Sequence, residues 1–296
     1  MLRASGAEFH VDFDLVRGNI TGIVRDGMEL MTKGPRLTFW RAPISNDMEM
    51  IDQMKKKYFL HLEHEIVRDI HYEKDGHFLR VMVKTINGAT NSAWHFDTTY
   101  EYVVCPTGDI LIRVAGVPEG KQDCAPEMFP RIGVSMQLNP QMEYVRYFGR
   151  GPGENYADSK EAGLMGVYEN TVDGLFTNYV VPRANGNHMD CKWVSLTNDR
   201  GMGIVASTED SFNFSASYYE EKDLEEAKHT CDLKKRDYIV FHVDYKQNGL
   251  GTYSCGQWQL EKYRAKNEPF AIEFRLTPFN KKEMEDKYIA HERIRL

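Results

Sequence analysis

Several features are scarce or missing in this chain of 296 residues. It has only five cysteines, which are odd in number, widely spaced and form no C-x-x-C pair, so neither a disulfide framework nor a zinc knuckle is predicted. A basic excess is also missing. The net charge of −7 at pH 7 argues against nucleic-acid binding, because phosphate contacts require clustered lysine and arginine.

Long apolar runs are equally absent from the sequence. No stretch approaches the roughly 20 apolar residues that a membrane helix needs. The N-terminus does not show the basic and then apolar pattern of a signal peptide. We therefore expect a cytoplasmic protein that binds no membrane. A hydrophobic content of 42% and a charged content of 27% are typical of a globular chain with a substantial core.

The strongest positive signal is a period of two. From Trp94 to Val104 the apolar or aromatic side chains fall mainly on even positions and the polar ones mainly on odd positions, which predicts a half-buried strand. Repeated strands of this kind predict antiparallel sheets with one wet face. Similar alternation occurs at 110–114, 212–218 and 272–276, and further strands are expected at 8–14, 77–86, 130–138, 144–149, 193–198, 202–207 and 237–245.

Helices are expected to be few and short. We predict one from Met48 to Leu62 with its N-cap among residues 45–47, one from Lys222 to Lys228, and one from Lys281 to Arg293. A (β/α)8 barrel requires regular alternation of strands and helices, which this sequence lacks. The predicted fold is all-β, with one large antiparallel sandwich over residues 1–280. Residues 281–296 are predicted to form a charged, helical extension on the solvated surface, with Glu283 and Lys287 paired.

The most unusual segment is Phe-Gly-Arg-Gly-Pro-Gly-Glu-Asn-Tyr-Ala-Asp at 148–158, where three glycines and a proline impose a tight excursion after a strand. This loop carries Arg150, Glu154, Asn155 and Asp158. Glu154 and Asp158 are closely spaced carboxylates, and a glycosidase pair would need a separation of about 5–9.5 Å. We favour the structural interpretation, in which these carboxylates bond to backbone N–H groups or to an arginine.

Other candidate groups give weaker signals. His61 and His64, and likewise His242 and Asp244, have a spacing that suits two metal ligands. No third ligand stands at a recognisable spacing, so no metal site is predicted. Trp258, near a glycine-rich stretch, is a candidate for stacking on the apolar face of a sugar ring.

Taken together and in order, the loop segments resemble the C-terminal domain, or small subunit, of the β-galactosidases of glycoside hydrolase family 2. The resemblance extends from about Ala7 to Pro278. It implies a β-supersandwich, the fold that galactose mutarotases also use. The matching segments are Phe-Trp-Arg-Ala-Pro-Ile-Ser-Asn-Asp at 39–47, Pro-Arg-Ile-Gly-Val at 130–134, Tyr-Phe-Gly-Arg-Gly-Pro-Gly-Glu-Asn-Tyr-Ala-Asp at 147–158, Gly-Val-Tyr at 166–168, Tyr-Val-Val-Pro-Arg-Ala-Asn-Gly-Asn at 179–187 and His-Val-Asp-Tyr-Lys-Gln-Asn-Gly-Leu-Gly-Thr-Tyr-Ser-Cys-Gly at 242–256.

The same resemblance implies an accessory role. In that family the acid/base and nucleophile glutamates belong to a barrel domain, so no catalytic residue is predicted in this chain. Its partner would be a barrel-bearing large subunit or upstream domains of the same enzyme, which hydrolyses terminal β-D-galactosides such as lactose. No cofactor is predicted here, and a Mg or Na ion would belong to the barrel-bearing partner.

Two loops are implied to complete the mouth of the active site. One is a mobile lip from Arg41 to Asp47, and the other, around residues 254–256, borders the site of the aglycone sugar. At Cys255 other members carry a tryptophan, so a smaller thiol wall replaces an indole unless Trp258 takes over the stacking. The implied substrate-binding residues are Arg41, Asn46, Asp47, Ser254, Cys255 and Trp258.

Two alternatives stay open at this point. One is a mutarotase-like aldose 1-epimerase, in which His188 or His242 would act with a glutamate at an anomeric carbon. The other is a non-catalytic carbohydrate-binding module. The sequence also leaves open whether the barrel lies on the same chain, which galactoside is preferred, and what the oligomeric state is.

Overall fold

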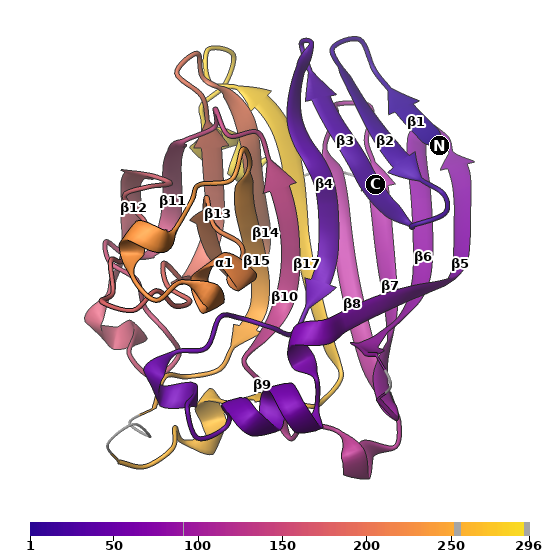
Figure 1. Cartoon of the computed structure of the whole chain (residues 1–296). Helices are drawn as coiled ribbons and strands as arrows, with labels where there is room; N and C mark the ends of the chain where they lie inside the picture. Colours follow the sequence, from indigo (N-terminus) through magenta and orange to yellow (C-terminus); the bar gives the residue numbers. More distant parts are fainter. Residues whose placement is uncertain (91, 252–255, 293–296) are drawn as a thin grey trace.

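A single curled antiparallel sheet dominates the computed structural model, which describes residues 1–90, 92–251 and 256–292 (Figure 1). Fifteen strands belong to this sheet, and β9 and β16 form a separate pair. The bounds of the strands are β1 Leu2–Ser5, β2 Phe9–Asp14, β3 Asn19–Arg25, β4 Met28–Thr38, β5 Glu63–Asp75, β6 Phe78–Ala89, β7 Trp94–Val104, β8 Ile110–Gly120, β9 Met128–Phe129, β10 Arg131–Leu138, β11 Tyr144–Gly151, β12 Leu164–Thr171, β13 His188–Thr197, β14 Met202–Ser217, β15 Ile239–Gln247, β16 Ala265–Lys266 and β17 Phe270–Asn280.

The strand order explains how one sheet becomes two layers. Its path is β1-β2-β3-β4-β10-β15-β14-β17-β8-β7-β6-β5, with β13, β11 and β12 continuing outward from β14. The sheet curls so that β1 to β4 lie over β5 to β8 (Figure 1). Phe13 on β2 meets Tyr102 on β7 with ring centroids 5.4 Å apart, which shows the two layers in contact.

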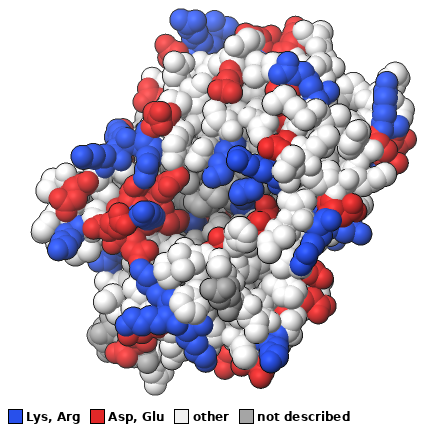
Figure 2. Space-filling view, turned by 45° about the vertical axis from the view of Figure 1, so that its right-hand side comes forward, with Lys and Arg blue, Asp and Glu red and all other residues white. Residues whose placement is uncertain are grey.

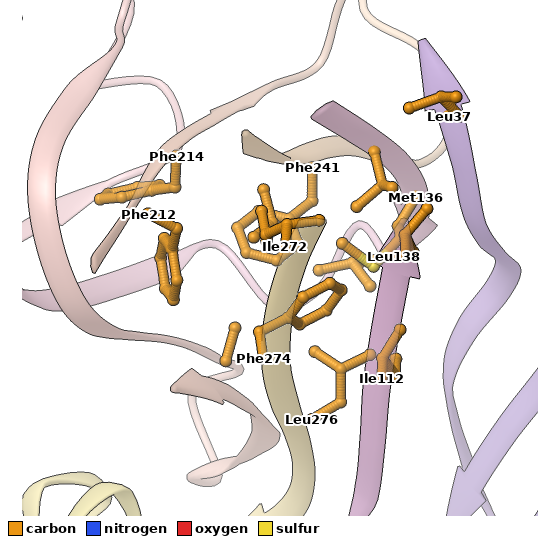
Figure 3. Close-up of a cluster of buried hydrophobic side chains, with 14 of the residues drawn as sticks. Leu37, Ile112, Met136, Leu138, Phe212, Phe214, Phe241, Ile272, Phe274 and Leu276 are labelled. Carbon is orange, nitrogen blue, oxygen red and sulfur yellow. The ribbon is translucent and has the colours of Figure 1, made fainter. Parts of the chain in front are cut away.

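The core fills the space between these layers. Along β7 the burial alternates as the sequence predicts, with Trp94, Phe96 and Tyr100 nearly inaccessible. Figure 3 shows Met136 and Leu138 from β10 meeting Ile272, Phe274 and Leu276 from β17. Inner strands such as β7 therefore bury one face, as expected for an antiparallel sandwich, whereas the edge strands β5 and β12 contain no fully buried residue.

The predicted strands are confirmed, and several are longer than predicted, such as β8, which continues to Gly120, and β17, which spans Phe270–Asn280. The segments 202–207 and 212–218 form one long strand, β14, and the strand expected at 193–198 begins earlier, at His188. The prediction missed β1, β3, β4, β5 and β12 and the two-residue strands β9 and β16. In β5 charged residues occupy much of an edge strand that is mostly exposed, so the period-two signal is weak.

The helices of the described residues are short, and the helix predicted from Met48 to Leu62 is found only in part. Residues 51–57 are helical, with Met54 N donating to Met50 O at 2.9 Å, but the chain then turns at Phe59, whose φ of 54° lies in the left-handed region, before a separate turn at Leu60–Leu62. The predicted helix at 222–228 is present as α1, shifted by a residue or two. The bounds are α1 Glu221–Glu226, α2 Asp286–His291, η1 Ser45–Asp47, η2 Gln53–Lys57, η3 Leu60–Leu62, η4 Gln122–Cys124, η5 Lys160–Ala162, η6 Thr230–Asp232 and η7 Glu261–Tyr263. None of the helices in the described ranges has the length and apolar character required to span a bilayer.

The segment after β17 contains α2, which packs on the sandwich. Asp286 is only 1% exposed and accepts hydrogen bonds from Arg146 Nη1 at 2.7 Å and Ser195 Oγ at 2.7 Å. Ile289 is buried against Trp193, Val205 and Phe279. The expectation of a solvated helix is therefore wrong for these residues.

The expected pair between Glu283 and Lys287 is also wrong. Glu283 instead pairs with Arg25 at 2.6 Å, and Lys287 pairs with Glu285 at 3.0 Å. The tail therefore interacts with β3 as well as with the region around β13 and β14. The boundary at Asn280 coincides with the end of β17, and the division into two domains there stays a prediction.

His188 is a second buried polar group, at the start of β13. It is 1% exposed, its Nδ1 lies 3.1 Å from Tyr147 Oη, and its ring stacks on Phe214 with centroids 5.2 Å apart. Burial penalises the imidazolium and lowers the pKa of His188 to about 4. The side chain is therefore neutral in the folded protein at physiological pH.

Replacing Asp286 with alanine should destabilise the fold by about 3 kcal/mol, because it leaves the partly buried Arg146 without this partner and removes the acceptor of Ser195. Urea unfolding would measure the loss. Glu285→Ala is the matched control, since the exposed Glu285 side chain forms, within the described ranges, an ion pair with the exposed Lys287 alone, and its loss should leave the midpoint nearly unchanged. Equal effects of the two substitutions would contradict a docked tail.

The stability of the protein should fall on acidification in a way that depends on His188. An unfolded histidine titrates near pH 6.5 and folded His188 near pH 4, so the unfolded chain binds the extra proton between these values. Stability from this group is present above pH 6.5 and is lost as pH falls toward 4. The free-energy advantage of the wild type over His188→Gln should shrink by about 2 kcal/mol between pH 7 and pH 4.5. Urea unfolding of both proteins tests this, and a constant difference would refute it.

Candidate functional site

Four segments that are far apart in the sequence join at one end of the sandwich. We call residues 41–47, 150–158, 183–187 and 247–251 the loop cluster. Backbone contacts link them: Ala184 N donates to Ala42 O at 3.4 Å, and Asn155 N donates to Asn187 O at 2.8 Å. Most of the residues that the sequence singled out lie in this cluster.

Arg41 and Asp47 form a buried pair at the base of the lip. Arg41 is 0% exposed and Asp47 is 4% exposed, and Arg41 Nη2 lies 3.3 Å from Asp47 Oδ1. Arg41 Nη1 also donates to the carbonyl of Asn248 at 3.1 Å. Asp47 accepts the backbone N–H of Ile44 at 3.1 Å. Both side chains hold the bend of the lip, and neither reaches the surface.

Asn46 and Asp158 both form hydrogen bonds with the backbone of the dipeptide Leu250–Gly251. The Asn46 amide donates to the carbonyls of Leu250, at 2.9 Å, and of Gly251. The Asp158 carboxylate accepts the N–H groups of Leu250 at 2.9 Å and Gly251 at 2.6 Å. All four backbone groups of this dipeptide are therefore engaged.

The dipeptide Leu250–Gly251 leads directly into residues 252–255. The predicted site residues Ser254 and Cys255 lie outside the described residues. A side chain at Gly249 would place its Cβ 2.9 Å from Asp158 Oδ2, so a glycine is needed for the carboxylate to approach. The anchor thus depends on Asn46, Asp158 and Gly249 together.

Glu154 has three donors around it. It accepts the hydroxyl of Tyr179, the N–H of Gly186 at 2.7 Å and the hydroxyl of Tyr156 at 3.4 Å. Burial and the hydrogen bond to Glu154 raise the pKa of Tyr179 to about 12. Glu154 and Asp158 are therefore both bonded to backbone N–H groups, and their hydrogen bonds hold the loops together.

Arg150 and Asn155 complete the glycine-rich loop. Asn155 is 2% exposed, donates to the carbonyls of Arg150 and Gly153 at 3.1 Å each, and accepts the N–H of Met189 at 3.0 Å. The Arg150 guanidinium donates to Asp190 at 2.6 Å. The loop is thus held by the buried amide of Asn155 and by the ion pair between Arg150 and Asp190.

Trp258 is partly buried and packs against the main core. The guanidinium carbon of Arg264 lies 5.5 Å from the centroid of its ring. One face of the indole is thus occupied by a cation from the same chain. Stacking of Trp258 on a sugar stays a prediction.

A buried polar cluster beside the loop cluster was not predicted. Arg131 on β10 is 3% exposed, lies 2.5 Å from Glu221 and 3.2 Å from Asp244, and its Nη1 lies 3.2 Å from a ring nitrogen of His242. Gln247 donates to Asp244 at 2.9 Å and lies 3.4 Å from Arg41 Nη1. This chain of contacts connects the cluster to the lip.

His242 and Asp244 share a strand face, as the sequence indicated. The side chain of Arg131, from the neighbouring strand β10, contacts both of them. Burial raises the pKa of Asp244 to about 6 against the opposing effect of Arg131, and burial together with Arg131 lowers the pKa of His242 well below its ordinary value. No group of three His, Cys, Asp or Glu within the described ranges is arranged to hold a metal ion. The register that places Gly133 opposite Asp244 leaves room for this carboxylate.

Comparisons with known proteins extend over almost the whole chain. The sequence model of the family described as "Beta galactosidase small chain" matches residues 5–276. A β-galactosidase of Kluyveromyces lactis is 30% identical over 273 residues, which cover 90% of this chain and 26% of that protein. A β-galactosidase of Actinobacillus pleuropneumoniae is 25% identical over 275 residues, or 93% of this chain and 26% of that protein. The chain thus spans about a quarter of the length of these relatives.

Solved structures are similar in fold. A galactose mutarotase related enzyme from Lactobacillus acidophilus superposes with a TM-score of 0.50 and 12% identity, covering 94% of this chain and 97% of that one. A galactose 1-epimerase from the same species gives a TM-score of 0.50 with 9% identity, covering 94% and 93%. At these identities the likeness concerns the fold alone. It confirms the predicted mutarotase-like all-β sandwich.

Replacing Asp158 with alanine should loosen the anchored dipeptide. Hydrogen bonds to a charged acceptor contribute about 1.5–3 kcal/mol each, so the amide hydrogens of Leu250 and Gly251 should exchange at least about tenfold faster. Hydrogen–deuterium exchange read by mass spectrometry or NMR measures this. Glu161→Ala is the control, because that carboxylate is 81% exposed and touches only Arg150. Unchanged exchange in the Asp158 variant would show that the anchor is not needed.

Proposed function

The chain belongs to the β-galactosidase small-chain family, and from this premise we propose that it is an accessory module of a β-galactosidase. The acid/base and nucleophile glutamates lie, in this proposal, in a barrel domain on a separate large subunit or upstream in the same enzyme. A Mg or Na ion would be bound there. The substrate is a terminal β-D-galactoside. Lactose as the natural substrate and a cytoplasmic location are further parts of the proposal, and each stays a prediction.

The observation that carries the proposal is that Glu154 and Asp158, the two closely spaced carboxylates, are both engaged in hydrogen bonds within the loop cluster. Glu154 is surrounded by two tyrosine hydroxyls and a backbone N–H, and Asp158 holds two backbone N–H groups. A catalytic pair must instead face a sugar across a gap, with one member free to transfer a proton. These carboxylates build a loop rather than a reaction centre.

A loop-building role suits an accessory module. We propose that the loop cluster presents residues 252–258 to the aglycone sugar, with Ser254, Cys255 and Trp258 as contacts, while Arg41, Asn46 and Asp47 hold the lip. Correct placement of such contacts lowers the barrier by orienting the substrate, and closure over the sugar excludes water. The module would therefore change the rate of hydrolysis without touching the reacting carbon.

The epimerase alternative has less support. His188 is enclosed by Tyr147 and Phe214, and His242 lies against Arg131 with its pKa lowered well below the ordinary value. The likeness to mutarotases is a relation of fold at 12% identity or less. A free-standing carbohydrate-binding module is less well supported than an accessory module, because the matching family is described as a β-galactosidase small chain, so neither alternative is carried forward as a second function.

Hydrolysis of a chromogenic β-galactoside should appear only when the chain is combined with the barrel-bearing part of the enzyme. In that assembly Asn46→Ala should reduce kcat/KM by roughly tenfold or more, because it releases the carbonyls of Leu250 and Gly251. Steady-state kinetics with the assembled enzyme provides the measurement. Substituting Cys255 with alanine should act mainly on turnover of disaccharides, in which the leaving group is a sugar.

Asn139→Ala is the matched control for Asn46→Ala. Asn139 also donates its amide to a backbone carbonyl, that of Glu29 at 2.7 Å, but it follows β10 at the end opposite Arg131. It should leave kcat/KM unchanged. Hydrolysis by the chain alone would overturn the proposal, and Glu154 with Asp158 would then be the first residues to reconsider.

A further inference from the structure

A cavity of about 660 Å³ lies over the outward face of β4, β10 and β15. Its floor includes Arg36 and Thr38 from β4, Ser135 from β10 and His242 from β15, and these strands turn their apolar side chains to the core behind them. Figure 2 shows a hollow near the middle of one face, with acidic side chains gathered beside it and basic side chains along it. The volume falls within the roughly 300–1,000 Å³ that small-molecule sites occupy.

Two other segments form the sides of the hollow. The acidic helix α1 borders one side, and η3 with the start of β5 borders the other. Glu221 of α1 lines the hollow and also accepts the N–H of Ala42 at 2.6 Å. The hollow therefore adjoins the lip of the loop cluster.

Glu63, at the start of β5, supplies an unusual carboxyl group. It accepts the backbone N–H of Phe39 and lies 3.4 Å from the hydroxyl of Thr38. Burial raises the pKa of Glu63 to about 8 in spite of these hydrogen bonds. A carboxyl group whose pKa is raised in this way takes up a proton more readily than an exposed one, and in the protonated form it can both donate and accept a hydrogen bond.

Two further polar atoms of the hollow lack a partner among the described residues. These are Nδ1 of His61 and Nε of Arg36, both of which are buried. Burial lowers the pKa of His61, so its ring is neutral and offers either a donor or an acceptor according to its tautomer. Buried polar groups normally have a hydrogen-bond partner, and these two residues line the same cavity.

The charges around the hollow balance one another. Lys55 pairs with Glu225, and Lys222 lies 3.7 Å from Glu226. Arg36 lies 3.5 Å from Glu65. Arg36, Lys55 and Lys222 therefore have acidic partners, and among the described residues Lys33 is the one lysine or arginine of the lining without an ion pair, so the hollow has little surplus charge with which to select a charged ligand. The indole of Trp40 adds an apolar wall.

We propose that this hollow is a binding site for a neutral, polyhydroxylated small molecule of the size of a monosaccharide or disaccharide. A hydroxyl of such a molecule can accept the Nε–H of Arg36, and it can either donate to or accept from the carboxyl group of Glu63 and Nδ1 of His61. The proposal goes beyond the accessory role, because binding is a property of this chain and needs no barrel domain. It holds or fails independently of β-galactosidase activity.

The test is titration of the 296-residue chain with D-galactose, D-glucose and lactose, followed by ¹⁵N–¹H spectra. At least one of these sugars should bind with a Kd on the order of 1 mM. The indole N–H signal of Trp40, which lines the hollow, should shift, whereas that of Trp258, near the loop cluster, should not. A shift confined to Trp258 would place sugar binding in the loop cluster and overturn the proposal.

The affinity of single-residue variants for the sugars tests which side chains of the hollow contact the ligand. Glu63→Leu and His61→Phe should each raise the Kd at least about tenfold, the effect of losing one buried hydrogen bond. Glu63→Gln should bind nearly as well as the wild type, because an amide also donates and accepts. Glu209→Gln, an exposed change on β14, is the control. If Glu63→Leu fails to fold, His61→Phe and Arg36→Met still decide the matter.

Two outcomes would contradict the proposal. The first is no saturable binding of any of the three sugars at concentrations well above the expected Kd. The second is tighter binding of inorganic phosphate or of a free amino acid than of the sugars, which would show that the hollow selects charge. Equal affinities of the wild type, Glu63→Leu and His61→Phe for the sugars would also exclude this site.

Discussion

Two buried arginines hold the functional end of this molecule together. Arg41 and Arg131 are 0% and 3% exposed, and burying an unpaired guanidinium would cost several kcal/mol. Arg41 is matched by Asp47 and a carbonyl, and Arg131 by Glu221 and Asp244. Gln247 lies between the two pairs. The lip and α1 are thereby joined to β10 and to the end of β15.

The ion pairs of Arg41 and Arg131 explain why polar loop residues can have a structural role and still matter for function. Asn46 belongs to the lip whose bend Arg41 and Asp47 hold, and its amide meets the same dipeptide, Leu250–Gly251, as the Asp158 carboxylate. Glu221 bonds to Arg131 with one oxygen and to the N–H of Ala42 with the other, while it also lines the hollow over β4, β10 and β15. The lip and the hollow thus share a carboxylate, so a ligand in one place contacts the frame of the other.

The sequence predicts the inner strands of the sheet better than its edge strands. Where a strand lies inside the sheet with one face in the core, as β7 and β17 do, alternation predicts it well. Edge strand β5 carries charges along an exposed surface and leaves little alternation to read. Residues 48–62 contain spaced apolar side chains that predict one helix, yet the helix ends near Lys57, so Met50 and Met54 enter the core from this short helical stretch and Leu60 from a separate turn after Phe59. Tertiary contacts there override the local pattern.

The sequence by itself determined the all-β class, the main strands, and the glycine-rich loop with its candidate polar residues, because periodicity and turn chemistry are local properties. The order of loop motifs also pointed to the family. Only the tertiary structure decided the partners of the polar residues. His242 and Asp244 suited a metal by spacing, but the cation beside them is Arg131, more than a hundred positions away in the chain. Strand pairing across such distances sets which charges meet, and a linear sequence does not contain that register in any local pattern.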